Sequence, residues 1–409
     1  MISNPVFIVS VMNDQILAEI LVRLPPKSVY RFRAVSKSWN QLISHPYFIE
    51  KYDRQQRRPD GVGLLSVFKD ISCPCSFCQP KKRKKLLEYP SLELEVSRMF
   101  PGQLRFINSS NGLILCKGRR CNEKEYEYLV LNPVTKRLVS LPPPPLSWPS
   151  ERSVGLMCEE NKSQLSAKYI VVLTDYLYLN ESGKATFPIV TYSSETRVWV
   201  AAKLRAIGTA AEKDFHSVFQ HHPLVMNGVF HWYHYSRETG TLTLALYRPD
   251  DEAAALDFRS YDGFGSHSTC SGALTRSPIE NGDVLWFALV DVFGKSMGVF
   301  MLPKGSQGWV SVYTITVESL RGDHTALLSS SRIFLNGLVP VNNKKTPVAL
   351  IRMEKKGRVF LCDVDTKAVQ SLPYHGRPVI TKWDEVICGP DFIAHYPYLP
   401  PSSLSTFAL

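Results

Sequence analysis

The chain has 409 residues, of which 44% are hydrophobic and 21% are charged, as in an ordinary folded protein with room for two or three domains. No apolar run reaches the ~18 residues of a membrane-spanning helix, and no basic residue precedes the short apolar stretch at the beginning. We therefore expect neither a membrane span nor a signal peptide. The net charge of +11 is local, because residues 51–85 carry ten Lys/Arg and only three Asp/Glu. A basic face spread over a whole nucleic-acid-binding domain is not expected.

Apolar residues at the beginning of the sequence recur at helical spacing in three short stretches. The first stretch starts near Asp14, and Pro25 ends it. Pro26 suits the first turn of a second helix, because its missing N–H would lack a partner there anyway. Ser36 can cap a third helix, which ends before Pro46. About forty residues cannot bury so many large side chains, so some must contact either the rest of the chain or a partner.

The stretch MNDQILAEILVRLPPKSVYRFRAVSKSWNQLISHPYF, residues 12–48, resembles the F-box in its plant form. Shared features are the acidic start, the LPPKS turn, the RFRAVSKSW segment and the LISHPYF ending; Val11-Met12 stand where the family has Leu-Pro. The resemblance implies binding to a Skp-type adaptor, which joins a cullin and a RING subunit in a ubiquitin ligase. The adaptor-binding residues that it implies are Met12, Ile16, Leu17, Ile20, Leu21, Pro25, Val29, Phe32, Val35 and Trp39.

Two patterns repeat through the remaining sequence with the same period. Asn-Gly pairs at 111–112, 227–228, 281–282 and 336–337 each precede an apolar run, and KYIVVL from Lys168 fits a unit that has lost its pair. The second pattern is an apolar residue, three further residues, Thr and then Lys or Arg. It begins at Leu131, Tyr192 and Cys362, with looser versions at Tyr247 and Leu302, in steps of 55 to 61 residues.

Each unit contains short β-branched and aromatic runs separated by polar turns, with no pattern of helical length between them. A period near 57 with about four strands predicts blades of a β-propeller, in which neighbouring blades cover one another. We expect five or six blades. Stepping the period back once more lands near residue 73, so GVGLLSVF from residue 61 and LLEYPSLELEV from residue 86 would start a sixth blade, and DEVICGPDFIAHYPYL near the C-terminus would complete it. The region also resembles the plant F-box-associated, Kelch-related domain, most clearly in SSNGLILC followed by LVLNPVTKRLVSLPPPP.

The expected fold is therefore mainly β, with a small three-helix F-box before a five- or six-bladed propeller-like domain. Its expected divisions are a tail (1–10), the F-box (11–50), a linker (51–60), the propeller (61–400) with a basic, Cys-containing loop at 70–85, and a tail (401–409).

The segment CPCSFCQPKKRKK from Cys73 mixes closely spaced thiols with a cationic run. Structural zinc sites need four tetrahedral ligands, and this segment supplies three, with Cys116 or Cys121 as the only nearby fourth. We expect an exposed loop with reduced thiols and no metal. The run Lys81, Lys82, Arg83, Lys84 and Lys85 is a solvated patch or a nuclear-import signal.

Two other motifs resemble active sites. GKSMG at residues 294–298 fits the serine-hydrolase elbow, but strands are expected on both sides of it where that chemistry needs a strand, a turn and a helix. Five histidines lie between His216 and His234, and His231 and His234 would point to opposite faces of a strand. We expect a hairpin turn for the first motif and ordinary surface or loop histidines for the second.

The leading hypothesis is a non-catalytic, substrate-recruiting subunit of a Skp–cullin–F-box ligase in the nucleus or cytoplasm, without cofactor, that binds an unidentified protein target. Aromatic candidates for the target-binding face are Tyr176, Tyr178, Trp232, Tyr233 and Phe264. Alternatives are an interaction module acting outside a ligase, a propeller hydrolase, and a zinc-stabilised nucleic-acid-binding protein. A hydrolase would require convergent catalytic groups, and the nucleic-acid-binding protein would require stoichiometric zinc.

Overall fold

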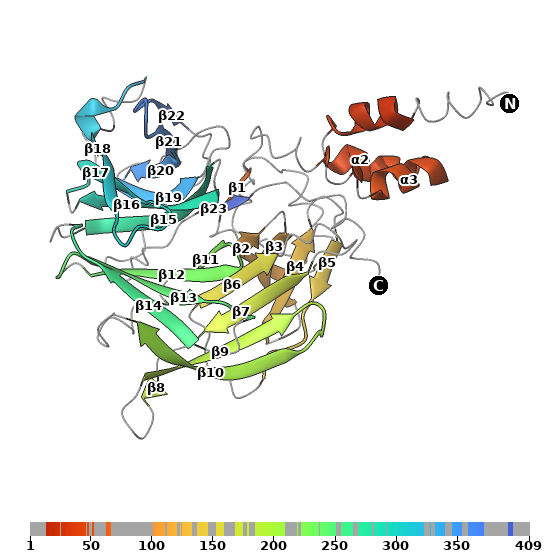
Figure 1. Ribbon diagram of the computed structural model, residues 1–409, viewed down its shortest axis with the longest axis horizontal. Coiled ribbons are helices and arrows are strands. Elements are labelled where there is room, and N and C mark those ends of the chain that lie inside the picture. Colours follow the sequence, from red (N-terminus) through yellow and green to blue (C-terminus); the bar gives the residue numbers. More distant parts are fainter. Residues whose placement is uncertain are drawn as a thin grey trace.

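A computed structural model shows a small helical unit beside a large assembly of strands (Figure 1). The residues that it describes are 14–24, 26–45, 47–48, 51–52, 63–66, 100, 102–110, 113–120, 123, 125–132, 137–145, 153–158, 168–174, 178–179, 185–208, 219, 222–236, 238–250, 255–264, 269–279, 282–291, 293–322, 328, 332–339, 346–353, 359–371 and 392–395. The mainly β fold with N-terminal helices agrees with the sequence prediction.

The helical unit contains a helix over residues 14–21, α2 (Pro26–Phe32) and α3 (Lys37–Ser44). The Ser36 hydroxyl accepts a hydrogen bond from the Trp39 N–H at 3.2 Å, so Ser36 caps α3 as expected. Helices of seven or eight residues are marginal in isolation. Their stability must therefore come from packing against one another.

Most strands form five blades, each built as a consecutive antiparallel series. The first blade holds β2 (Gly102–Ser110), β3 (Leu113–Arg120), β4 (Glu127–Asn132) and β5 (Arg137–Ser140). The second holds β6 (Ser153–Cys158), β7 (Tyr169–Thr174), β9 (Ala185–Ser193) and β10 (Trp199–Gly208), with β8 (Tyr178–Leu179) paired to β9. The third holds β11 (Leu224–Met226), β12 (Val229–Ser236), β13 (Thr241–Tyr247) and β14 (Ala255–Tyr261). The fourth holds β15 (Thr269–Ile279), β16 (Gly282–Asp291), β17 (Ser296–Leu302) and β18 (Val310–Thr316), and the fifth β19 (Ile333–Val339), β20 (Val348–Met353), β21 (Val359–Asp363) and β22 (Val369–Ser371).

The second repeat pattern marks the same place in every blade. Its five starting residues lie at or one residue before the end of the third main strand, namely Leu131, Tyr192, Tyr247, Leu302 and Cys362. The pattern therefore encodes the hairpin to the outermost strand. The Asn-Gly pairs do not share one structural role: Asn227 and Gly228, both at positive φ, turn between β11 and β12, whereas a register shift in β19 lies between Leu335 and Gly337.

The core lies at the seams between blades, not inside any one of them. Leu115 and Val130 of the first blade pack with Val171 and Val190 of the second, and similar clusters join each later pair of described blades. A blade strand therefore buries both of its faces. On β12, for example, Trp232 packs toward the second blade and Tyr233 toward the fourth.

The second and third blades are joined into one nine-stranded sheet. The end of β10 pairs in parallel with β14, with Arg205 opposite Ala255 and Gly208 opposite Phe258. Gly208 has φ +104°, and a Cβ atom there would lie 2.1 Å from the Phe258 carbonyl oxygen, so this close approach requires glycine. This pairing between neighbouring blades was not expected from the sequence.

One further pair of strands, outside the five blades, joins the two ends of the propeller sequence. β1 (Gly63–Ser66) pairs antiparallel with β23 (Phe392–His395), so a strand near residue 65 contacts one near residue 394. These strands lie in the two stretches expected to complete a sixth blade. Closing a ring of blades in this way protects its terminal edges.

Candidate functional site

The helical unit has a core of its own. Its buried side chains are Ala18, Leu21, Val22, Val29, Ile43, Phe48 and Tyr52. The Tyr52 hydroxyl donates to the Leu24 carbonyl oxygen at 2.8 Å, and burial raises the pKa of Tyr52. Tyr52 is therefore part of the core of the helical unit.

The predicted adaptor-binding residues divide between the interior and the surface of this unit. Leu21 and Val29 are 1% and 0% exposed and belong to the core that holds the helices together. Leu17, Phe32 and Trp39 are partly buried against the same core. Met12 and Pro25 lie outside the described residues.

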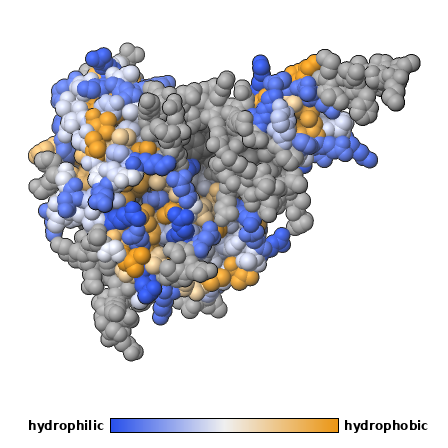
Figure 2. Space-filling view, in the orientation of Figure 1, coloured by the Kyte–Doolittle hydropathy of each residue, from blue (hydrophilic) through white to orange (hydrophobic). Residues whose placement is uncertain are grey.

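Ile16, Ile20 and Val35 lie on the surface, with exposed fractions of 56%, 54% and 59%. Ile16 and Ile20 are four residues apart on one helix, so their side chains lie on the same helical face. Tyr47, 61% exposed, was missed by the sequence prediction, because no helical periodicity points to it. Figure 2 shows apolar surface next to hydrophilic surface on this unit. These four side chains are called the apolar surface set below.

Polar contacts fix the geometry of the helices around this set. The Arg33 guanidinium donates to Asn40 Oδ1 at 2.8 Å and to Ser44 Oγ at 3.3 Å, which ties the end of α2 to α3. Lys51 forms an ion pair with Glu19, and this hydrogen bond lowers the pKa of the Glu19 carboxyl. Glu19 is exposed and Lys51 partly exposed, so the ion pair orients side chains more than it stabilises the fold.

The helical unit also contacts the propeller. Tyr30 of α2 is partly buried against the apolar cluster at the seam of the first and second blades, as is Trp199 of β10. Trp199 donates from its indole N–H to the Pro142 carbonyl oxygen at 2.6 Å.

The motif at residues 294–298 lies in the hairpin between β16 and β17, which confirms the turn predicted for it. The Asp291 carboxylate accepts from the Lys295 N–H at 2.8 Å and from the Ser296 hydroxyl at 2.7 Å. The serine hydroxyl is therefore used to hold a turn, and no helix follows it to build a hydrolase elbow.

The histidine-rich segment contains a core residue, contrary to the expectation of surface and loop histidines. His231 is 5% exposed, and its Nδ1 lies 3.0 Å from the Val229 carbonyl oxygen. Burial lowers the pKa of His231 to about 4. His234 is more exposed, as alternation along the strand predicts.

Three of the aromatic candidates for a target-binding face are also interior. Trp232, Tyr233 and Phe264 are buried at seams between blades, which corrects that expectation, and the environments of Tyr176 and Tyr178 lie outside the described residues. Large aromatic side chains bury the most apolar area, so a seam is where such residues are most stabilising. The amino-acid composition alone could not distinguish aromatic residues at a seam from aromatic residues on a binding face.

No group of three His, Cys, Asp or Glu side chains placed to hold a metal ion occurs in the described part of the chain. Nor does any helix there have the length and apolar character needed to cross a membrane. The segment with Cys73 and the run Lys81–Lys85 lie outside the described residues. Cys116, Cys158 and Cys362 are buried free thiols, and burial raises the pKa of Cys116 and Cys362.

Family models match both parts of the chain. A model for "F-box protein At3g26010-like, beta-propeller" matches residues 85–328, and the F-box domain model matches residues 10–51. F-box protein At3g26010 of Arabidopsis thaliana is 24% identical over 77% of this chain and 71% of its own length. F-box protein At5g03970 of the same plant is 22% identical over 95% of this chain and 89% of its own length.

Other similarities are more limited. F-box protein At5g49610 of Arabidopsis thaliana is 28% identical over 54% of this chain. The chain spans a little over half the length of this and two other curated relatives that it matches. Among solved structures, the six-bladed Aleuria aurantia lectin is 9% identical over 68% of this chain and 80% of its own, with a TM-score of 0.37, from which nothing about ligands follows.

The N-terminal helices have a core of their own and carry the apolar surface set, and the strands that follow form blades with cores between them. The helices match the F-box model, and the blades match the propeller model. The propeller model alone covers more than half of the sequence. The chain therefore belongs to the plant F-box proteins that carry a C-terminal At3g26010-like β-propeller.

Proposed function

We propose that this chain is the substrate-recognition subunit of a Skp–cullin–F-box ubiquitin ligase. An F-box followed by a β-propeller is typical of such receptors. The helical unit would bind a Skp-type adaptor, and through it cullin and RING subunits, while the propeller binds a target protein. The role is non-catalytic: it raises the effective concentration of target lysines near a charged conjugating enzyme.

The observation that carries this proposal is the apolar surface set. Ile16, Ile20 and Val35 are more than half exposed, although seven side chains of the helical unit are buried in a core among the described residues. Exposed apolar side chains gathered on one small unit mark a protein interface. Among the described residues predicted for adaptor binding, these three are the exposed ones, which supports their use in an interface.

The alternative is an interaction module acting outside a ligase. Such a module would use the same surface to bind the adaptor without recruiting a cullin. Lys81–Lys85 would give such a protein, or the ligase subunit, access to the nucleus.

The test is a pull-down of purified Skp-type adaptor by the full chain and by Ile20→Asp and Val35→Asp. We expect both variants to lose at least about tenfold in affinity, because a carboxylate would be buried without a partner at the interface. Val200→Asp is the matched control, since Val200 of β10 is 61% exposed but lies on the propeller. Leu21→Asp is unsuitable, because it would disrupt the core of the helices.

Capture of adaptor by the wild type and by Val200→Asp, but not by the two helical variants, supports the proposal. Failure of the folded wild-type chain to bind the adaptor would overturn it. Equal binding by all four proteins would show that the apolar surface set is not the adaptor site.

A further inference from the structure

Four consecutive prolines, residues 142–145, follow β5 at the edge of the first blade. They are called the proline segment below. Each proline restricts its own φ to about −65° and disfavours the helical region for the residue before it. No cis peptide bond occurs among the described residues, so the four prolines are trans. The segment therefore forms a left-handed polyproline II helix, which has about three residues per turn and no internal hydrogen bonds.

The proline segment is anchored at its beginning. Leu141, the residue before it, is 3% exposed and lies in the apolar cluster at the seam of the first and second blades. The Leu141 N–H donates to the Tyr128 carbonyl oxygen at 2.8 Å, and the Trp199 indole N–H donates to the Pro142 carbonyl oxygen at 2.6 Å. One end of the polyproline helix is thus fixed to the propeller.

Beyond this anchor the segment faces solvent. Pro142 and Pro143 are exposed, and Pro144 and Pro145 are partly exposed. Within the described part of the chain, the carbonyl oxygens of Pro143 and Pro144 accept no hydrogen bond. Proline rings and carbonyl oxygens are therefore presented together on a stiff backbone that has already lost its conformational freedom.

The end of a strand explains one proline here, but not four. The first blade reads LNPVTKRLVSLP and the fifth reads CDVDTKAVQSLP, so Pro142 and Pro373 correspond in sequence. After this shared proline the fifth blade continues with YHGR, whereas the first continues with three more prolines. A single proline is enough to stop strand pairing, because it has no N–H to donate. The three additional prolines are not needed for that purpose.

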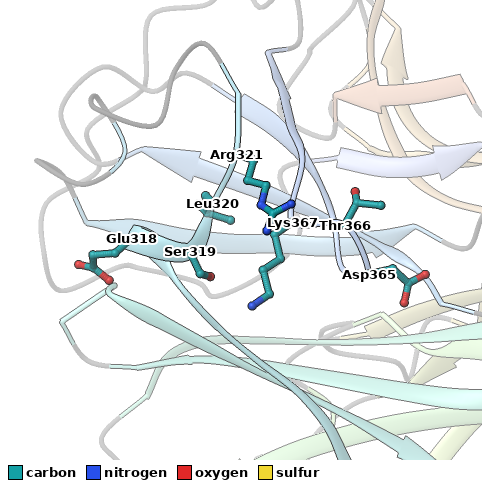
Figure 3. Close-up of a pocket in the computed structure, with 7 residues that line it drawn as sticks. All are labelled: Glu318, Ser319, Leu320, Arg321, Asp365, Thr366 and Lys367. Atoms are coloured by element: carbon teal, nitrogen blue, oxygen red, sulfur yellow. The ribbon is translucent and has the colours of Figure 1, made fainter.

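The fourth blade uses the equivalent segment differently. After β18, the Arg321 N–H donates to the Lys367 carbonyl oxygen at 2.9 Å, and the Val369 N–H donates to the Arg321 carbonyl oxygen at 2.8 Å. This segment is thus paired with the fifth blade, beside an open pocket of about 520 Å³ (Figure 3). Prolines cannot donate such a backbone hydrogen bond to the next blade. The backbone of the proline segment therefore stays available to another molecule.

We propose that the proline segment is a docking site for a protein domain that binds polyproline II helices in a groove lined with aromatic side chains. Such grooves use the low entropy of a ligand that is already in its bound conformation. No charged residue lies between Arg137 and Glu151 in the sequence, and Leu141 is buried. The partner therefore recognises proline rings and carbonyl oxygens. This inference goes beyond the proposed function and does not depend on it.

The experiment uses three ¹⁵N-labelled probes, an isolated SH3 domain, a WW domain and an EVH1 domain, because each binds proline-rich ligands in an aromatic groove. Unlabelled full chain is added, and the chemical shifts of the groove residues are followed by NMR. We expect shifts in the groove of at least one domain, and an excess of a decaproline peptide should reverse them. The double variant Pro143→Ala, Pro144→Ala should bind at least about tenfold more weakly, because it removes two rings and restores backbone freedom.

Pro303→Ala is the matched control, since Pro303 is a single, partly exposed proline in the hairpin between β17 and β18. Groove shifts that are kept in this control and lost in the double variant support the inference. Absence of shifts in all three domains with folded full chain would overturn it. Shifts that persist in the double variant would overturn it as well, because the domain would then bind elsewhere. The double variant should capture the adaptor as the wild type does, because the proline segment lies outside the apolar surface set.

Discussion

Eleven large hydrophobic side chains are exposed among the described residues, and four of them belong to the helical unit, which is about a tenth of the chain. The propeller carries the other seven on a much larger surface. It can cover its apolar residues because each described blade packs against a neighbour and because β1 pairs with β23. The short helices of the helical unit have no such neighbours on all sides.

This difference explains why the two parts respond differently to mutation. In the helical unit, residues with the same apolar character have opposite roles: Leu21 holds the fold together, and Ile20 beside it contacts solvent. In the propeller, apolar residues on both faces of a strand such as β12 are structural. The following predictions test which residues stabilise each part of the fold and which only lie on its surface.

The largest effect is expected for Leu21→Ala, because Leu21 is 1% exposed in the small core. Its loss should destabilise the helical unit by about 2–5 kcal/mol, while Ile20→Ala should change it by about 0.5 kcal/mol or less. Amide hydrogen exchange of residues 14–45 measures this change, with propeller amides as the internal reference. Equal effects of the two variants would contradict the division into core and surface.

The next effect concerns the pH dependence of the propeller. Burial lowers the pKa of His231 to about 4 from the ordinary 6.5, so the unfolded chain takes up a proton first as the pH falls. The free energy of unfolding should therefore decrease from about pH 6.5 downward, by on the order of 3 kcal/mol once the pH is below 4. Chemical denaturation across this range should show the decrease in the wild type and lose it in His231→Gln. His45→Gln, at an exposed position in the helical unit, should keep it.

A smaller effect is expected at the seam between the second and third blades. The Trp232 indole N–H donates to the Ser153 hydroxyl at 2.9 Å, and both residues are buried. Ser153→Ala should leave this N–H without its acceptor and destabilise the propeller by about 1–3 kcal/mol. A double-mutant cycle with Trp232→Phe checks the reason, because Ser153→Ala should cost less where the indole is already absent. Additive losses would mean that the hydrogen bond contributes little.

The blades could be predicted well from the sequence, because each repeat shows both in the spacing of the units and in the residues of their turns. The pattern beginning at Tyr192 and Cys362 marks the hairpin to the outermost strand in both blades, and Arg197 and Lys367 adopt positive φ at the same offset. The pairing of β1 with β23 agrees with the expectation that stretches from the two ends of the propeller sequence complete one blade.

Two features could not be read from the sequence. The parallel pairing of β10 with β14 depends on backbone hydrogen bonds between neighbouring blades, which no side-chain alternation records, although Gly208 is the residue that permits it. In the helices, apolar residues occur on several sides, so periodicity finds the helix but not the face that packs inward. The sequence therefore did not show that Leu21 is buried and Ile20 exposed.

The smallest predicted effect lies at the cap of α3. Ser36 accepts the Trp39 N–H, and Ser36→Ala should cost about 1 kcal/mol, whereas Ser36→Asp should retain the cap because its carboxylate can accept the same bond. Amide exchange in α3 should become faster in the alanine variant alone, and exchange in β12 should not change in either. Faster exchange in β12 would mean that the contact of Tyr30 with the first seam couples the two parts. In that case the helical unit and the propeller would unfold together, and their stabilities could not be assigned separately.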